Sequence, residues 1–291
     1  VFPKGTHCTD ISQLMVPGRL IHMDAAEVST GGSVANTGLA LKLLGADVRL
    51  LGKVGNDAFG TMVKDILASY GAGGLVVDAE STTSYSVVVA IPGIDRIFLH
   101  SPGANNSFTN ADIPEDALED GAIFHIGYPP VMRRLYEKDG AELAAILRRV
   151  KNHGIATSMD MTNIDPNSEA GKIDWTKILA AALPHTDFFV PSFEELCFML
   201  NRARYDALSA RGGDMTEHLD MLRDVKPLAE KCLELGCRAV LIKCGISGMY
   251  YKTSGKAAME TVGSRLQLDT DTWADREGIQ PCFRADRVLS G

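Results

Sequence analysis

Two short glycine-rich stretches carry residue types that are suited to hold a small ligand. They are residues 31–36 (GGSVAN) and 52–60 (GKVGNDAFG). The adjacent glycines of the first stretch have no Cβ atoms, so a ligand or a neighbouring backbone can approach them closely. Ser33 is suited to cap the helix that follows, and the amide of Asn36 can donate and accept hydrogen bonds in its first turn. Such a turn often only joins a strand to a helix, but two such units in tandem favour a binding site.

Polar or glycine-rich residues also follow four of the expected strands. They are residues 127–129 (GYP), 160–163 (DMTN), 191–195 (PSFEE) and 243–248 (KCGISG). Ligands of open α/β sheets bind beyond the carboxyl ends of the strands. We therefore expect these four segments to surround one site.

Two of these segments can be interpreted in two ways. Ser192 and Glu195 fit a capping box, in which each side chain bonds to the other residue's backbone at a helix start. The same glutamate is also suited to lie near a hydrated Mg²⁺, which keeps most of its waters and needs few protein carboxylates. Gly245 and Gly248 fit an ordinary loop between strands, or a close approach of backbone to a phosphate or a base. The residues alone leave these alternatives open.

Composition and missing motifs argue against several classes of protein. The chain has 291 residues, of which 45% are hydrophobic and 23% are charged, as in ordinary globular proteins. Its net charge of −8 argues against nucleic-acid binding. No apolar run approaches the roughly 20 residues of a membrane span, so we expect no membrane partner. The motifs GxxxxGK(S/T), GxSxG and HExxH are missing, which argues against P-loop, serine-hydrolase and zinc-protease sites.

The six cysteines show no metal-binding or disulfide pattern. They are Cys8, Cys197, Cys232, Cys237, Cys244 and Cys282. None forms a CxxC pair, so we interpret them as free thiols in a reducing compartment, with the cytoplasm as the default. Cys232 and Cys237 are expected to pack in the core.

Hydrophobic periodicity predicts the elements that position these residues. Helices are expected at residues 35–44, 57–70, 142–153, 175–183, 193–201 and 222–235. Strands are expected at residues 19–24, 48–54, 82–91, 95–100, 122–127, 155–160, 187–190, 238–243, 249–252 and 257–261. From residue 122 onward strands and helices alternate. This order predicts an α/β fold with a doubly wound, mainly parallel sheet and helices on both faces.

A second, smaller sheet is expected apart from the main one. The two β-rich runs on either side of residues 92–94 (PGI) predict a hairpin. Together with residues 19–24, this hairpin is expected to form a small antiparallel sheet from segments near 8–30 and 82–101. We expect a single domain over residues 1–291, with residues 201–217 as a mobile surface loop.

In the order of its motifs, the chain resembles the ribokinase-like, or PfkB, family of carbohydrate kinases. The first family signature is matched by residues 31–36, 43–45 (LLG) and 52–60. Three later segments resemble further family motifs, namely 100–105 (HSPGAN), 191–195 and 243–248. The resemblance runs across almost the whole chain, and its first signature is the most specific part.

The resemblance implies a function and its cofactors. The implied enzyme transfers the γ-phosphoryl group of ATP to a hydroxymethyl group of a sugar, nucleoside or related small alcohol. It implies ATP and Mg²⁺ as cofactors, with a monovalent cation as a further option. The small antiparallel sheet would be a lid that excludes water, and lids of two copies would pair edge to edge into a homodimer.

The resemblance also implies roles for individual residues. The substrate would contact Gly31, Gly32, Ser33, Asn36, Pro102, Gly127 and Tyr128. The nucleotide would border Ser192, Lys243, Gly245 and Gly248. Glu195 would act on Mg²⁺ through water.

The chain departs from the family pattern at both ends. The second signature, G-A-G-D, supplies an anion hole and the catalytic aspartate, and it would follow residues 283–291. An initial strand ending in a sugar-binding aspartate would precede residue 1. We therefore expect the parent protein to be longer, with its catalytic Asp beyond Gly291. Asp286 is not a suitable substitute, because it lacks the glycines that would build the anion hole.

Other departures leave the substrate and one alternative function open. Ser192 replaces an asparagine, Gly127 supplies no carboxylate where ribose kinases have a glutamate, and residues 160–163 lack the arginine of fructokinase-like relatives. The missing base motivates the alternative of a catalytically inert sugar- or nucleotide-binding protein on the same fold. A Rossmann-type dehydrogenase is a weaker alternative, because the spacing G-x-G-x-x-G is missing after the first strand.

Overall fold

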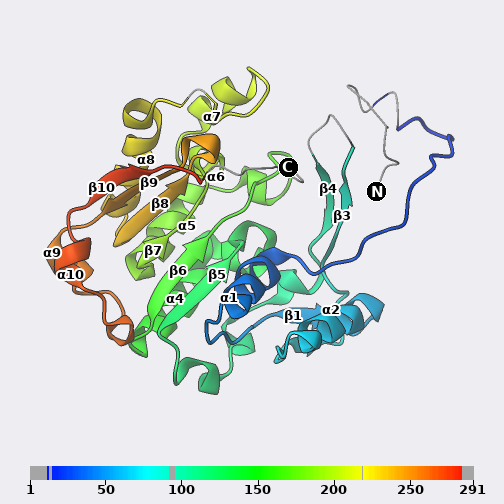
Figure 1. Ribbon diagram of the computed structural model, residues 1–291, viewed down its shortest axis with the longest axis horizontal. Helices are drawn as coiled ribbons and strands as arrows, with labels where there is room; N and C mark the ends of the chain where they lie inside the picture. The colour runs from blue at the N-terminus through cyan, green and yellow to red at the C-terminus, as the bar shows by residue number, and fades with distance from the viewer. Residues whose placement is uncertain (1–11, 13–14, 92–95, 218, 284–291) are drawn as a thin grey trace.

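The main body of the protein is a mixed sheet whose central strands are parallel. The computed structural model describes residues 12, 15–91, 96–217 and 219–283 (Figure 1). In this part of the chain the main sheet has six strands, in the order β10-β9-β8-β7-β6-β5. The strands are β5 (Ile123–Gly127), β6 (Ala156–Asp160), β7 (Phe188–Phe189), β8 (Ala239–Lys243), β9 (Met249–Thr253) and β10 (Glu277–Gln280). Strands β5 to β8 run parallel to one another, whereas β9 is antiparallel to both of its neighbours, β8 and β10. The predicted fold class is therefore confirmed.

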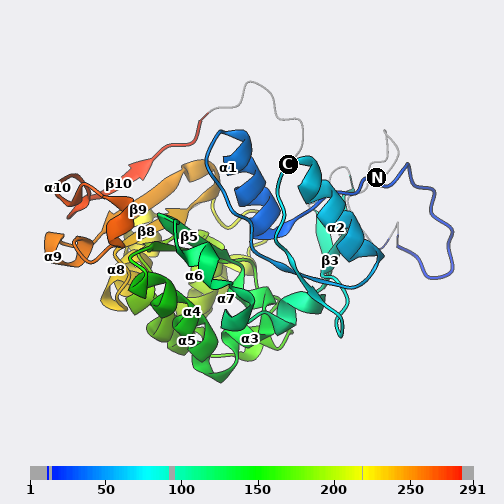
Figure 2. The same cartoon turned by 90° about the horizontal axis from the view of Figure 1, so that it is seen from below.

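Helices lie on both sides of this sheet. The α-helices are α1 (Ala40–Leu43), α2 (Ala58–Ser69), α3 (Arg133–Tyr136), α4 (Ala141–Asn152), α5 (Trp175–Ala182), α6 (Phe193–Leu200), α7 (Arg202–Ser209), α8 (Lys226–Glu234), α9 (Lys256–Met259) and α10 (Thr270–Trp273). In Figure 2, α1 lies on the opposite side of the strands from α4 and α5. Within the described residues, no helix combines the length and the apolar character that crossing a membrane requires.

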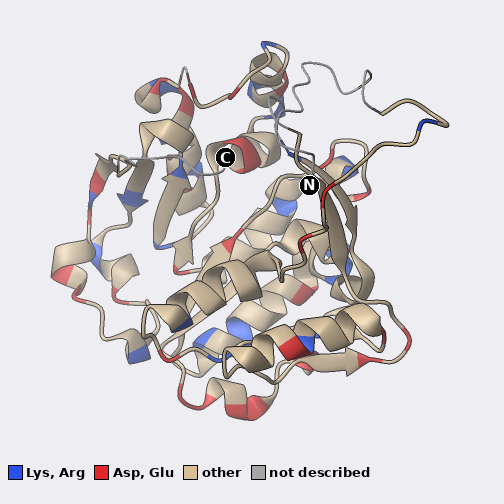
Figure 3. Cartoon of the chain, turned by 45° about the vertical axis from the view of Figure 1, so that its right-hand side comes forward, with Lys and Arg blue, Asp and Glu red and all other residues tan. Residues whose placement is uncertain are grey.

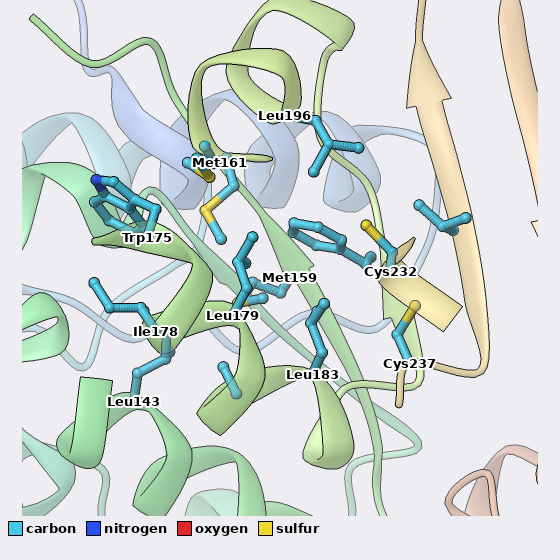
Figure 4. Packing of buried hydrophobic residues seen from close by; sticks show 14 of the residues in the cluster. Leu143, Met159, Met161, Trp175, Ile178, Leu179, Leu183, Leu196, Cys232 and Cys237 are labelled. Atoms are coloured by element: carbon cyan, nitrogen blue, oxygen red, sulfur yellow. The ribbon is translucent and has the colours of Figure 1, made fainter. Parts of the chain in front are cut away.

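The largest core fills the space between the sheet and helices α4, α5, α6 and α8. Helix α4 buries Leu143, Ile146, Leu147 and Val150, which share one helical face. Cys232 and Cys237 lie in the same core, as predicted, with Met159, Leu179 and Leu183 around them (Figure 4). Burial raises the pKa of the Cys237 thiol to about 12, so this side chain behaves as a small apolar group.

A buried carboxylate connects distant segments at the amino end of β7. Asp187 is fully buried and forms an ion pair with Lys151. Its other oxygen accepts hydrogen bonds from the backbone N–H groups of Thr157 (3.0 Å) and Gly263 (3.3 Å). Burial lowers the pKa of Lys151, and the carboxylate opposes that shift. These donors replace the water that the carboxylate loses on folding.

Two small sheets stand beside the main one. Strands β1 (Lys53–Gly55) and β2 (Val76–Asp78) are parallel. Strands β3 (Tyr85–Val89) and β4 (Ile97–Ser101) form the predicted antiparallel hairpin, which projects away from the main sheet in Figure 1. The turn at residues 92–95 lies outside the described residues.

The predicted helix at 35–44 is present but has an unusual start. Its first part, Val34–Leu39, is π-helical and continues into α1. The chain then turns at Gly45, whose φ of +89° suits a glycine at a helix end.

Several local predictions are wrong. Residues 19–24 form no strand, and Leu20 is 84% exposed, because their alternating pattern finds no neighbouring strand. The part of the predicted lid at residues 8–11 and 13–14 lies outside the described residues. The predicted strand at 48–54 is reduced to β1.

The C-terminal half shows two further differences from the prediction. The expected loop at 201–217 contains helix α7, which Asn201 caps and an ion pair between Arg202 and Asp206 supports. Residues 257–261 belong to α9 and the turn after it, and β9 pairs with β8 and β10 instead.

Candidate active site

The carboxyl ends of four neighbouring strands bring the predicted segments together at one edge of the main sheet. Gly127, at the end of β5, pairs in register with Asp160 at the end of β6. Lys243, at the end of β8, forms an isolated bridge with Ser192. The Nζ atom of Lys243 donates to Oδ1 of Asp160 across a distance of 2.7 Å. The edge therefore carries a charged pair, with 43% of the lysine side chain and 15% of the aspartate side chain exposed.

The first glycine-rich stretch reaches this edge through Asn36, whose side chain approaches the hydroxyl of Tyr128. Burial, followed by the nearby carboxylate of Asp160, raises the pKa of the Tyr128 hydroxyl. Tyr128 has a left-handed backbone with φ of +68°, an uncommon and costly conformation for a tyrosine. The chain thus turns sharply after β5 and directs this ring toward Asn36.

The start of the helix packs directly on the end of β5. A Cβ atom on Gly127 would overlap the side chain of Ser33, so only glycine fits there. The expectation that Ser33 caps the helix is wrong, because Ser33 itself has helical dihedral angles and makes no capping bond. Above it, Cβ atoms on Gly31 or Gly32 would meet nothing within 4 Å. The space over these two glycines is open to a ligand.

The predicted capping box at Ser192 and Glu195 is present. The Ser192 N–H donates to Oε2 of Glu195 across 2.7 Å, and the Glu195 N–H donates to Oγ of Ser192 across 3.2 Å. Burial raises the pKa of Glu195, and the Ser192 N–H and Lys243 oppose that shift. Within the described residues, no group of three or more His, Cys, Asp or Glu side chains is arranged to hold a metal ion. The capping bond engages one carboxylate oxygen and leaves Oε1 for other contacts.

Neighbouring residues of the protein leave no room for a side chain at the two glycines of the loop after β8. A Cβ atom on Gly245 would overlap Thr216, and one on Gly248 would overlap the carbonyl oxygen of Gln280. Both residues have positive φ, at +53° and +94°. This packing favours the interpretation as a loop, and Lys243, just before it, keeps 43% of its side chain exposed.

The second glycine-rich stretch anchors the base of the hairpin. Asp57 caps α2 and accepts hydrogen bonds from the Thr83 hydroxyl (2.6 Å) and the Thr83 N–H (2.8 Å). These bonds, led by the Thr83 hydroxyl, lower the pKa of Asp57. Nearby, a Cβ atom on Gly103, directly after Pro102, would overlap the carbonyl oxygen of Thr82. Residues 52–60 thus fix the position of the hairpin.

A polar pocket of about 410 Å³ lies at the base of the hairpin. Its lining consists of Ser81, Gly103, Asn106, Ser107, Arg133, Arg134 and Glu137. The two arginines are paired with Glu137, so this pocket carries little net positive charge. It shares no lining residue with the cluster at the sheet edge.

His125 and Ser158 are polar residues of the site that the sequence motifs do not indicate. Nδ1 of His125 lies 2.9 Å from Oγ of Ser158 on the neighbouring strand. Burial lowers the pKa of His125. Residues two positions apart in a strand lie on the same face of the sheet. The spacing of His125 and Gly127 therefore could have predicted that His125 lies on the same face as the site.

The chain matches one protein family over most of its length. Residues 7–270 match the family described as pfkB family carbohydrate kinase. Two similar curated proteins come from Oryza sativa subsp. japonica. Fructokinase-2 is 29% identical over 176 residues, covering 58% of this chain and 50% of that protein. Fructokinase-1 is 34% identical over 101 residues, covering 33% and 31%. The chain thus spans half or less of the length of these two relatives.

Solved structures share the fold. The crystal structure of a fructokinase with bound ATP from Xylella fastidiosa matches with a TM-score of 0.58 and 21% identity, covering 77% of this chain and 65% of that one. At 21% sequence identity, this similarity shows a shared fold and no more than that. The mixed sheet, its helices and the separate hairpin are therefore a known arrangement.

Proposed function

Because the chain belongs to the pfkB family of carbohydrate kinases, we propose that it forms the acceptor-binding part of an ATP-dependent sugar kinase. The reaction transfers the γ-phosphoryl group of ATP to a hydroxymethyl group of a sugar or a related small alcohol. The observation that carries this proposal is the direct packing of Ser33 on Gly127, at the carboxyl end of β5. It joins the first glycine-rich stretch to the carboxyl edge of the sheet, where ligands of such sheets bind.

The acceptor would lie over the two open glycines, beside the amide of Asn36 and the hydroxyl of Ser33. Amide and hydroxyl groups both donate and accept, which suits the hydroxyl groups of a sugar. The acceptor side consists of Gly31, Gly32, Ser33, Asn36, Pro102, Gly127 and Tyr128. Two similar proteins are fructokinases, so D-fructose is the first acceptor to test.

The nucleotide would lie on the side of β8. Its border consists of Ser192, Lys243, Gly245 and Gly248. Phosphoryl transfer depends mainly on positioning and on stabilising negative charge. The partly exposed ammonium group of Lys243 is suited to this task, and Asp160 holds it at the sheet edge.

Glu195 would hold a hydrated Mg²⁺ through water. The residues fit such a role, because Mg²⁺ keeps several waters and needs only one or two carboxylates besides phosphate oxygens. When bound, the ion neutralises negative charge on the phosphates. A monovalent cation is a further option, which a comparison of K⁺ with Na⁺ would test.

The hairpin would act as the lid and as the surface through which two copies pair. Its exposed apolar side chains support this assignment, since Val87, Val88, Phe98 and Leu99 are 48–56% exposed. We propose a cytoplasmic homodimer without nucleic-acid or membrane partners. The mixture of acidic and basic segments in Figure 3 agrees with the absence of a nucleic-acid partner.

A coupled assay of ADP release tests the proposed function. The full-length protein is supplied with ATP and a panel of acceptors that includes D-fructose, D-ribose and several nucleosides. We expect turnover of at least one acceptor and its loss when EDTA removes divalent cations. Asn36→Ala should weaken acceptor use, whereas Asn167→Ala, on an exposed turn, should not. Failure of every acceptor in the panel would overturn the proposal.

A further inference from the structure

The imidazole of His125 has one satisfied and one unsatisfied nitrogen. Nδ1 is bonded to Ser158, whereas Nε2 is buried and has no hydrogen-bond partner within the described residues. Burying a polar atom without a partner costs free energy, so native proteins rarely do so without a reason. His125 is not among the residues that we propose to contact the acceptor, the nucleotide or the metal ion.

The hydroxyl of Ser33 and that unsatisfied nitrogen both border the Cβ position of Gly127. A Cβ atom built on Gly127 would lie 2.7 Å from Oγ of Ser33 and 3.7 Å from Nε2 of His125. Both atoms therefore border the same space beside Gly127. Gly127 has no Cβ atom, and this absence lets the two side chains approach each other. Oγ of Ser33 and Nε2 of His125 are no further apart than the sum of these two distances, so a movement of Ser33 toward the ring can bring them within hydrogen-bond distance.

Ser33 is placed where such a shift is feasible. It directly precedes the π-helical segment Val34–Leu39 and follows Gly32, whose φ is +74°. π-Helical turns are uncommon and often occur at functional sites. A hydroxyl can donate or accept, so Ser33 can pair with Nε2 in either neutral tautomer of the ring, while Ser158 takes the complementary role at Nδ1.

We propose that His125 is a positioning residue for the acceptor. When the acceptor binds over Gly31 and Gly32, Nε2 of His125 pairs with Oγ of Ser33 and fixes the direction of that hydroxyl. Ser158 holds the opposite side of the ring. This inference rests on the proposed function, in which Ser33 belongs to the acceptor side.

The test measures acceptor affinity with and without the imidazole. D-fructose and D-ribose are titrated into the full-length protein by calorimetry without nucleotide, and the KM values for acceptor and ATP are measured in parallel. We expect His125→Leu to weaken acceptor binding about fivefold to tenfold, the loss of one hydrogen bond, and to leave the KM for ATP unchanged. The Tm should change little, because leucine removes a buried unsatisfied atom, which offsets the loss of the bond between Nδ1 and Ser158. His125→Gln, which keeps a donor and an acceptor, should restore most of the affinity.

A double-mutant cycle separates this role from simple packing. Ser33→Ala alone should weaken acceptor binding, and adding His125→Leu to it should cause little further loss, because both changes remove the same bond. His185→Leu, at the opposite end of the sheet, is the matched control and should change nothing. Unchanged acceptor affinity in His125→Leu, or additive losses in the double variant, would overturn the inference. A wild-type protein that binds an acceptor without phosphorylating it would instead overturn the kinase proposal alone, because the calorimetric test needs no turnover.

Discussion

The ion pair between Lys243 and Asp160 is better suited to function than to stability. Its 2.7 Å contact lies at the sheet edge, and nearly half of the lysine side chain is exposed. Ion pairs with such exposure contribute only about 0–1 kcal/mol to the free energy of unfolding. The pair therefore matters mainly because it keeps a positive charge where phosphates would lie.

Replacing this lysine should impair nucleotide use more than folding. We expect Lys243→Met to raise the KM for ATP about tenfold or more, since a charge-assisted contact to phosphate is lost, while the KM for the acceptor changes little. The coupled ADP-release assay measures both constants. Lys256→Met removes another exposed ion pair, with Asp271, and serves as the control. An unchanged KM for ATP in Lys243→Met would contradict the assignment.

The carboxyl group of Asp78 has a lowered pKa in the folded protein. The Ser107 hydroxyl donates to its carboxylate across 2.6 Å and is the main reason why the pKa of Asp78 falls to about 2. A carboxyl whose pKa is lower in the folded state stabilises the fold fully above its ordinary pKa near 4, and this contribution disappears as the pH falls toward 2.

The variant Ser107→Ala should lose part of this stabilisation. We expect its Tm to lie below that of the wild type by a constant amount above about pH 5, and the difference to shrink as the pH falls below 4. Scanning calorimetry between pH 3 and pH 6 measures the effect. Ser69→Ala removes an exposed hydroxyl that donates to a backbone carbonyl, so its effect should not depend on pH. A difference for Ser107→Ala that is equal at every pH would contradict this account.

At the scale of elements, Asp57 couples helix α2 to the base of the hairpin. Its side chain caps the helix and holds the backbone and the hydroxyl of Thr83, just before β3. Thr83 in turn accepts a hydrogen bond from the N–H of Gly55 at the end of β1. Three elements therefore depend on one carboxylate.

Removing that carboxylate should loosen the hairpin as well as the helix. We expect Asp57→Ala to lower the Tm by a few degrees and to speed amide hydrogen exchange in both α2 and β3–β4. Asp174→Ala removes a comparable cap, at the start of α5, and should leave exchange in the hairpin unchanged. Equal exchange in the hairpin of both variants would show that Asp57 acts only on its own helix.

Elements with strong hydrophobic periodicity were predictable from the sequence. Helix α4 and strands β6 and β8 lie within one or two residues of the expected bounds, since their buried faces dictate their periods. Residues 19–24 also alternate between apolar and polar side chains, but they form no strand. A strand needs a hydrogen-bonded neighbouring strand, and the local sequence does not show whether one is present. Strand β10 was missed, since its exposed residues carry no clear period.

The site was predictable where its contacts are local. The capping box of Ser192 and Glu195 follows from a spacing of three residues. The approach of Asn36 to Tyr128 brings together positions far apart in the chain, and it depends on a left-handed turn at a tyrosine that no side-chain pattern predicts. The packing behind Gly245 was likewise hidden, because Thr216 approaches it from a different element.

The hairpin presents exposed apolar side chains on both of its strands, among them Val87, Val88, Phe98 and Leu99. Val88 and Phe98 are directly opposite each other in the β3–β4 register, and both are about half exposed. Such pairs on a free two-stranded sheet are typical of contact surfaces. Pairing of two hairpins would cover them.

A charge on this surface should therefore separate the two copies. We expect the wild type to sediment as a dimer at micromolar concentration and Val88→Asp to sediment as a monomer with nearly the same Tm. Leu222→Asp introduces the same charge at an exposed leucine elsewhere and should remain dimeric. Analytical ultracentrifugation distinguishes the species, and a monomeric wild type would refute the proposed dimer.

The buried carboxylate of Asp187 has a consequence for the order of events during synthesis. One of its donors, the N–H of Gly263, lies 76 residues further along the chain. At about 5–20 residues per second, the ribosome needs roughly 4–15 s to make that stretch. Until then the carboxylate has Lys151 and the N–H of Thr157 as partners but lacks the N–H of Gly263. We therefore expect the surroundings of Asp187 to be complete only after Gly263 has been synthesised.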